Sequence, residues 1–121
     1  MNKSIMNYLE DFEQYGIIQD EAIETGEYKK ANATVKKLEK ILLVAKEDSE
    51  SEKFYLTILK KSKSKSAIIT ACSQMLKLNI NAEVARNELE KIANSSEKSM
   101  SRMSAKMFLQ EWDKGNIKPI V

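Results

Sequence analysis

The sequence lacks histidine altogether and has a single cysteine, Cys72, among its 121 residues. Metal sites built from His and Cys, Ser-His-Asp triads, Cys-His pairs and disulfide frameworks are therefore excluded within this chain. Proline occurs once and glycine three times. An all-β fold needs many tight turns, which these two residues usually supply, so the composition favours a helical fold.

Long hydrophobic runs are missing as well. The longest apolar stretches, 41–45 and 67–69, fall far short of the roughly 20 residues that cross a bilayer, so we expect no membrane-spanning segment. The N-terminal residues carry one lysine and then acidic residues, without the continuous apolar region of a secretion signal. Since a lone cysteine fits a reducing compartment, these features predict a cytoplasmic protein.

Apolar residues make up 42% of the chain and charged residues 31%, which suffices for one core with a solvated surface. We expect a single helical-repeat-like domain over residues 1–121, a common size for a domain. Apolar side chains recur at steps of three and four residues, the spacing of amphipathic helices. The spacing and the turn residues predict six helices, at about 4–25, 27–47, 49–61, 64–78, 82–93 and 97–114.

Local signals mark several of these boundaries. Gly26 follows the first helix as a left-handed cap, Ser49 begins a Ser-Glu-Ser-Glu capping box, and Asn81 can cap the fifth helix. Gly16 lies inside the first helix and could kink it. Asn32 lies beside an apolar stripe, and we expect it to hydrogen-bond an inter-helix turn rather than to mark a concave surface.

The fourth helix is apolar on nearly all sides, which is typical of a buried helix. We therefore expect Cys72, which lies on it, to be a core residue rather than a nucleophile. The sixth helix carries Met100, Met103 and Met107, which could form an adaptable binding face, but core filling is the commoner use and is expected here. We expect Trp112 to close the open end of the core.

The turns between the third and sixth helices are short, which places consecutive helices antiparallel and side by side. Stacked antiparallel pairs are typical of helical-repeat proteins, although no clean internal sequence repeat separates a short solenoid from a plain bundle. The predicted fold is therefore all-α, with about six helices in a short HEAT- or armadillo-like α-α superhelix.

Three parts of the chain together resemble a known family. Residues 21–32 read EAIETGEYKKAN, residues 105–115 read AKMFLQEWDKG, and the middle is matched by 71–76, Ala85 and 89–93. On these stretches the chain resembles a family of small bacterial all-helical proteins, HEAT- or armadillo-like in shape, which form a domain of unknown function. The resemblance implies a stack of α-hairpins. The family has no settled activity, so the resemblance implies none, but some members are similar to immunity proteins that neutralise polymorphic toxins.

The resemblance does not extend to every position of the family pattern. Where the family usually has a Val-Arg pair and a tryptophan, this sequence has Ala67, Ile68 and Thr70. No role of that arginine or tryptophan can therefore be carried over to this chain.

Charge is unevenly distributed along the chain. Residues 1–28 contain seven acidic residues against one lysine, whereas residues 29–47 contain six lysines against two glutamates, within a total charge of +2. One interpretation is that the first two helices attract each other across exposed edges, where each ion pair contributes only about 0–1 kcal/mol. The other is an acidic stripe that binds a basic protein, such as a nuclease toxin, since complementary charge selects partners. Its candidate residues are Glu10, Glu13, Asp20, Glu24 and Glu27.

A second candidate surface is the basic turn formed by Lys60, Lys61, Lys63 and Lys65, which could contact the phosphates of a nucleic acid. Nucleic-acid binding usually needs more positive charge and more aromatic side chains near it. Acidic pairs one helical turn apart lack the apolar setting of catalytic carboxylates, and the sequence has no Gly-rich phosphate loop. We therefore predict a non-enzymatic protein-binding module without metal or cofactor. Our working hypothesis is an immunity protein that neutralises a co-encoded toxin, and the alternative is a nucleic-acid-associated helical protein.

Overall fold

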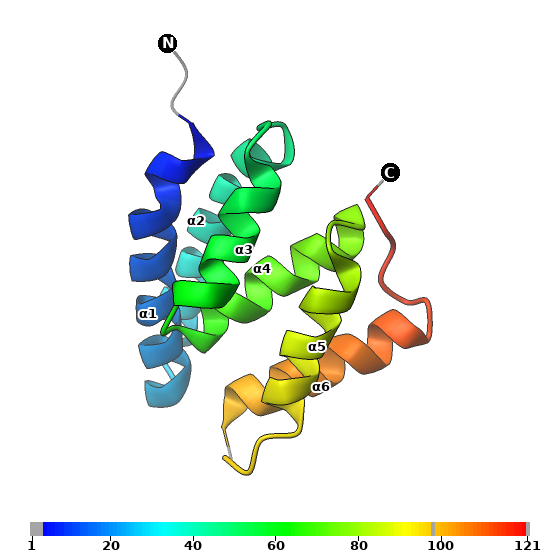
Figure 1. Ribbon diagram of the computed structural model, residues 1–121. Coiled ribbons are helices and arrows are strands. Elements are labelled where there is room, and N and C mark those ends of the chain that lie inside the picture. The colour runs from blue at the N-terminus through cyan, green and yellow to red at the C-terminus, as the bar shows by residue number, and fades with distance from the viewer. Residues whose placement is uncertain (1–3, 98, 121) are drawn as a thin grey trace.

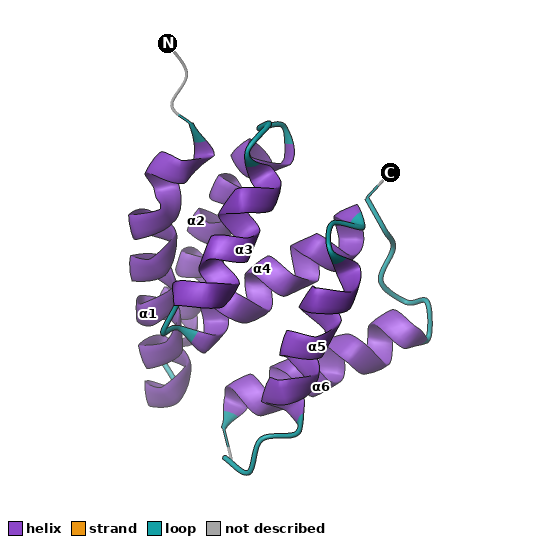
Figure 2. Ribbon diagram, in the orientation of Figure 1, coloured by secondary structure: helices purple, strands orange, loops and turns teal. Residues whose placement is uncertain are grey.

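The computed structural model describes residues 4–97 and 99–120. Over these residues the secondary structure consists of helices joined by turns, without a strand, and so confirms the all-α prediction (Figure 1, Figure 2). A short 3-10 helix precedes six α-helices. The elements are η1 (Ile5–Tyr8), α1 (Leu9–Thr25), α2 (Tyr28–Lys46), α3 (Ser51–Lys61), α4 (Lys65–Leu78), α5 (Ala82–Ala93) and α6 (Met100–Asp113).

Consecutive helices pack as pairs, α1 with α2, α3 with α4 and α5 with α6. The centre of the stack is α4, which crosses the molecule between α1 and α3 on one side and α5 and α6 on the other (Figure 1). It is buried on most sides, as its apolar sequence predicts. Its core residues are Ala67, Ala71, Cys72, Met75 and Leu76. The predicted stack of helix pairs is therefore present, with α4 joining its two halves.

Aromatic side chains fill the core beside α4. Phe12 of α1 meets Phe54 of α3 edge to face, with ring centroids 5.6 Å apart, and Phe54 meets Tyr55 in the same way at 5.7 Å. On α6, Trp112 stacks on Phe108 with ring centroids 6.1 Å apart, and both rings pack partly buried against the core. One continuous core thus runs from α1 to α6.

Most helix boundaries fall where the sequence predicts them. Gly26 ends α1 with a φ of 76°, and the following amide, of Glu27, donates to the carbonyl of Ala22 at 2.8 Å. The fifth helix spans the predicted residues. The sixth begins later than predicted, because the Ser99 hydroxyl accepts a hydrogen bond from the Arg102 amide at 3.2 Å and caps the helix there.

One predicted cap is wrong, and another has the predicted position without the capping hydrogen bond. Ser49 does not cap α3; the N-cap is Glu50, whose amide donates to Asp48 Oδ1 at 2.7 Å. Asn81 is the N-cap of α5, as predicted, but it has a φ of 45° and its side chain forms no capping hydrogen bond; its Nδ2 donates to Glu52 Oε1 at 2.9 Å.

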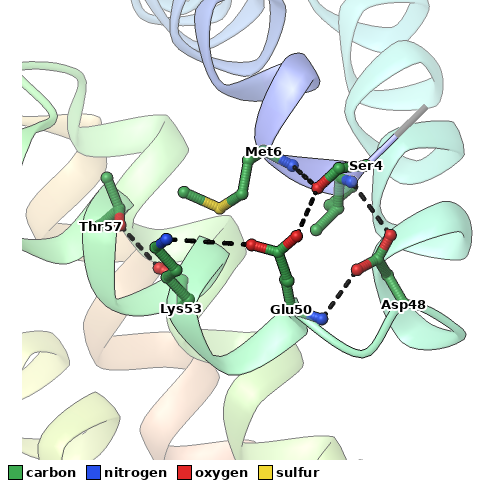
Figure 3. Close-up of polar contacts among 7 residues, drawn as sticks. Ser4, Met6, Asp48, Glu50, Lys53 and Thr57 are labelled. Atoms are coloured by element: carbon green, nitrogen blue, oxygen red, sulfur yellow. Dashed lines mark hydrogen bonds and ion pairs between the residues drawn. The ribbon is translucent and has the colours of Figure 1, made fainter.

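The α2–α3 turn also anchors the start of the described chain (Figure 3). Asp48 accepts the Ile5 amide at 3.0 Å through its second carboxylate oxygen, and the Ser4 hydroxyl donates to Glu50 Oε1 at 2.9 Å. The same Ser4 oxygen accepts the Met6 amide at 3.2 Å. These bonds hold η1 against the turn and place the Ile5 side chain, which is fully buried, in the core.

Two predictions fail because they assumed burial. Asn32 is exposed on α2, and its side chain forms no hydrogen bond with a described residue. The methionines of α6 do not fill the core, since Met100, Met103 and Met107 are 51%, 55% and 59% exposed. The helix buries Ala105 and Leu109 against its neighbours instead. A helix with apolar residues on two sides can turn only one of them inward.

Gly16 determines how closely α1 approaches α4. It lies buried within α1, which continues as a helix on both sides of it rather than ending there. A Cβ atom at this position would lie 2.5 Å from Ser64 Oγ and 2.7 Å from Ala67 Cβ, at the start of α4. Only glycine therefore fits at this helix crossing.

Gly16→Ala is expected to lower the free energy of unfolding by about 1–3 kcal/mol, because the added methyl group overpacks the helix crossing. The sign of this change in stability is informative, because Gly→Ala at an exposed helix position stabilises a protein by about 1 kcal/mol. Urea denaturation measures the difference, with Ala33→Gly on the exposed side of α2 as a propensity control. A Gly16→Ala variant as stable as the wild type would contradict the close contact.

Candidate functional site

The structure brings the acidic first helix and the lysine-rich turn before α4 together. Glu13 of α1 accepts hydrogen bonds from the Ser62 hydroxyl and, at 2.9 Å, from the Lys63 amide. Two turns further on, Asp20 accepts from the Ser64 hydroxyl at 2.7 Å and from both the amide, at 3.0 Å, and the hydroxyl of Ser66. Two predicted site residues thus hold α1 against the turn between α3 and α4.

These contacts satisfy the amino-terminal end of α4. The first amides of a helix have no partner within the helix. Ser64 is the N-cap and accepts the Ala67 amide at 3.1 Å, while the carboxylate of Asp20 takes the Ser66 amide. A negative charge at this position also complements the helix dipole. Glu13 and Asp20 are half-buried and engaged in these bonds, so they are less available to a partner than the other predicted acidic residues.

The remaining predicted acidic residues, Glu10, Glu24 and Glu27, are exposed. Glu27 lies in the α1–α2 turn, where it accepts from the Thr25 hydroxyl at 3.1 Å. We define the outer acidic stripe as the residues that follow one another on the solvent side of α1 at steps of three and four. They are Glu10, Gln14, Ile17, Glu21 and Glu24.

Glu21 belongs to this stripe, although it is not among the acidic residues predicted to bind a partner. It lies four residues after Ile17 and three before Glu24, so helical periodicity alone could have identified it. Ile17 is partly exposed in the middle of the stripe and gives it an apolar centre.

The first two helices pack together. Within the described residues, no carboxylate of α1 forms an ion pair with a lysine of α2. Instead, a lysine of α2 forms a cation–π contact with α1: Lys37 Nζ lies 5.3 Å from the centre of the Tyr15 ring. The ion pairs lie on other elements. Over residues 4–97 and 99–120, the outer acidic stripe therefore forms no ion pair.

A pocket of about 470 Å³ lies where the end of α1, the α3–α4 turn and the start of α6 meet. Asp20 and Glu24 line one side of it, and Lys63 and Lys65 line another. Lys65 forms an ion pair with Glu97, which holds the pKa of that carboxyl below its usual value. Residues from both predicted surfaces, acidic and basic, thus share one pocket of mixed charge.

The basic turn is exposed at Lys60, Lys61 and Lys63. The carboxylates of Glu13 and Asp20 contact the serines and amides of the same turn. Negative charge so close to the lysines weakens the positive potential that a phosphate backbone would need.

Buried reactive groups do not add a chemical site. Cys72 and Tyr55 have fully buried side chains. Burial raises the pKa of each to about 12, so the thiol and the phenol stay protonated near neutral pH. Among residues 4–97 and 99–120, no three His, Cys, Asp or Glu side chains gather in a metal-binding arrangement, and no helix has the length and hydropathy to cross a membrane.

Comparison of the chain with protein-family models, with curated proteins and with solved structures gives no match. The arrangement of residues on the structure is therefore the basis for assigning a function. Its most distinctive surface feature is the outer acidic stripe, and its most distinctive internal one is the contact of Glu13 and Asp20 with the start of α4.

Asp20→Asn is expected to lower the free energy of unfolding by about 1–3 kcal/mol, because the amide loses the charge and one of the two acceptor oxygens. Glu21→Gln removes the same charge at the adjacent exposed position and should change stability by about 0.5 kcal/mol or less. Chemical denaturation of both variants compares the two effects. Equal effects would mean that Asp20 does not support α4.

Cys72 is expected to be unreactive toward a thiol reagent such as DTNB in the folded protein at mildly alkaline pH, because its thiol is buried and protonated. Addition of denaturant should expose it and give one equivalent of reaction. Rapid labelling of the folded chain, at a rate near that of a free cysteine, would place Cys72 at the surface and reopen its role as a nucleophile.

Proposed function

We propose that this protein is a non-enzymatic protein-binding module of the immunity type, which neutralises a toxin by direct binding. The outer acidic stripe of α1 is the binding surface. The single observation that carries the proposal is that Glu10, Glu21 and Glu24 lie exposed along one side of α1 and form no ion pair with any described residue.

A row of unpaired carboxylates favours a basic partner. Complementary charge accelerates encounter and rejects partners of the wrong sign. A toxin that acts on nucleic acid carries a basic surface for its substrate, and an acidic helix placed on that surface would block it. Ile17 supports contact with a protein, since interfaces usually have an apolar centre within a polar rim.

The stripe is well prepared for binding because α1 is held on two other sides. Phe12 and Ala22 are buried in the core, and Glu13 and Asp20 fasten the helix to α4. A surface that is already ordered loses little conformational entropy when a partner binds.

The same geometry makes the nucleic-acid alternative the weaker candidate. Carboxylates of α1 contact the basic turn, and Lys65 of that turn is paired with Glu97. A phosphate backbone approaching Lys60, Lys61 and Lys63 would meet these negative charges as well. We also propose that the chain is a member of the family it resembles and that it acts in the cytoplasm.

The test is an affinity pull-down from lysate of the source cells with three forms of the chain. They are the wild type, the stripe variant Glu10→Lys/Glu21→Lys/Glu24→Lys, and a control variant Glu39→Lys/Glu47→Lys/Glu83→Lys, which changes exposed acidic residues outside α1 by the same total charge. Circular dichroism and thermal melting should show all three folded alike.

We expect a basic protein at stoichiometric yield with the wild type and the control variant, and at least about tenfold weaker binding by the stripe variant. Recovery of nucleic acid by the wild type, lost on Lys60→Glu/Lys61→Glu, would favour the alternative. A protein partner retained equally by all three forms would show that the outer acidic stripe is not the binding surface.

A further inference from the structure

The exposed methionines of α6 form an apolar surface on the side of the helix opposite its core face. The core face consists of Ala105 and Leu109, which are buried, with Phe108 and Trp112 packed beside them. Met100, Met103 and Met107 follow one another at steps of three and four, so they share one side of the helix. At 3.6 residues per turn this side lies about 180° from the core face. The structure leaves this side uncovered within the described residues.

Two cations border the methionines. Arg102 and Lys106 line, with Met100 and Met103, a shallow hollow of about 410 Å³. Neither cation forms an ion pair with a described residue. The methionine face is defined here as Met100, Arg102, Met103, Lys106 and Met107.

The carboxylates of the same helix are engaged elsewhere. Asp113 accepts two hydrogen bonds from the guanidinium of Arg86, at 2.9 and 2.8 Å, and this pairing holds the pKa of its carboxyl below the usual value. Glu111 accepts from the side-chain amide of Asn116 at 2.6 Å. At the start of α6, Met100 also lines the pocket of mixed charge that contains Asp20, Glu24, Lys63 and Lys65. Around Met103 and Met107, the surface that α6 offers to a partner is apolar with the positive charge of Arg102 and Lys106 along its edge.

We propose that the methionine face docks an amphipathic acidic helix of a partner protein. Such a helix carries apolar residues every three or four positions and carboxylates beside them. The apolar side chains would pack among the methionines, whose flexible thioethers adapt to varied surfaces. The carboxylates would pair with Arg102 and Lys106, and arginine is well suited to bidentate pairing. Helix-in-groove recognition combines these same two elements.

The methionine face selects a partner of the opposite charge to the one the outer acidic stripe selects. The outer acidic stripe lies on α1 and the methionine face on α6, the first and last α-helices of the stack (Figure 1). The proposal for the methionine face does not depend on the proposal for the outer acidic stripe. The α1 stripe of another copy is a poor occupant, because it offers a single apolar side chain, Ile17, among its carboxylates. Three methionines need a more apolar partner face than that.

The test is a titration of the full chain, labelled with ¹³C at the methionine methyl groups, with two designed helical peptides. Both carry leucines on one face; one has glutamates beside the leucines and the other has lysines at the same positions. We expect the glutamate peptide to shift the methyl resonances of Met100, Met103 and Met107, while the buried Met75 serves as an internal control. The lysine peptide should bind at least about tenfold more weakly.

Charge exchange makes the test specific. Arg102→Glu/Lys106→Glu should weaken the glutamate peptide at least about tenfold and strengthen the lysine peptide. Lys29→Glu/Lys36→Glu, which changes exposed lysines of α2 by the same charge, should leave both affinities unchanged. The proposal is overturned if the glutamate peptide does not shift these resonances, if both peptides bind equally, or if the Arg102 and Lys106 changes have no effect. Methyl shifts that depend on protein concentration alone would instead identify the face as a contact between copies, which also overturns it.

Discussion

The close approach of α1 to the start of α4 is the constraint on which the rest of the structure depends. Gly16 provides the room, because Ser64 and Ala67 occupy the space where a Cβ atom would lie. Glu13 and Asp20, one turn to either side, supply the acceptors for the amides and hydroxyls of the turn that enters α4. Since α4 in turn contacts α3, α5 and α6, this one crossing sets the position of both halves of the stack.

The same helix thus divides its acidic residues between two tasks. Those on the side facing α4 replace water around the end of a neighbouring helix, where a charge-assisted hydrogen bond is stronger than at an exposed site. Those on the solvent side are exposed and form no ion pair with a described residue, which leaves their charge for an encounter with another molecule. Helical periodicity places both sets within seventeen residues of α1, so one segment stabilises the fold and shapes the surface.

Sequence periodicity predicted all six helices, the central burial of α4 and the left-handed end of α1 at Gly26, because these depend on short-range order. It could not predict contacts between distant segments. Asp48 rather than Ser49 contacts the Glu50 amide, the Asn81 side chain bonds to Glu52, and Gly16, for which a kink was expected, lies against Ser64 and Ala67. On α6 the methionine and the aromatic sides are both apolar, so composition alone did not say which side faces inward. The sequence indicated the acidic residues of α1 together as one candidate surface. Only the position of α4 shows which of these carboxylates face inward and which face solvent.

A double-mutant cycle between Asp20→Asn and Ser66→Ala measures the central contact most directly. Ser66 donates to Asp20 through both its amide and its hydroxyl, so the two changes should not add, and we expect a coupling energy of about 1 kcal/mol or more. The cycle between Glu21→Gln and Ser66→Ala provides the reference and should be additive. Additivity of the Asp20 and Ser66 changes within about 0.5 kcal/mol would contradict the account, because α1 would then not be held to α4 through its inner carboxylates.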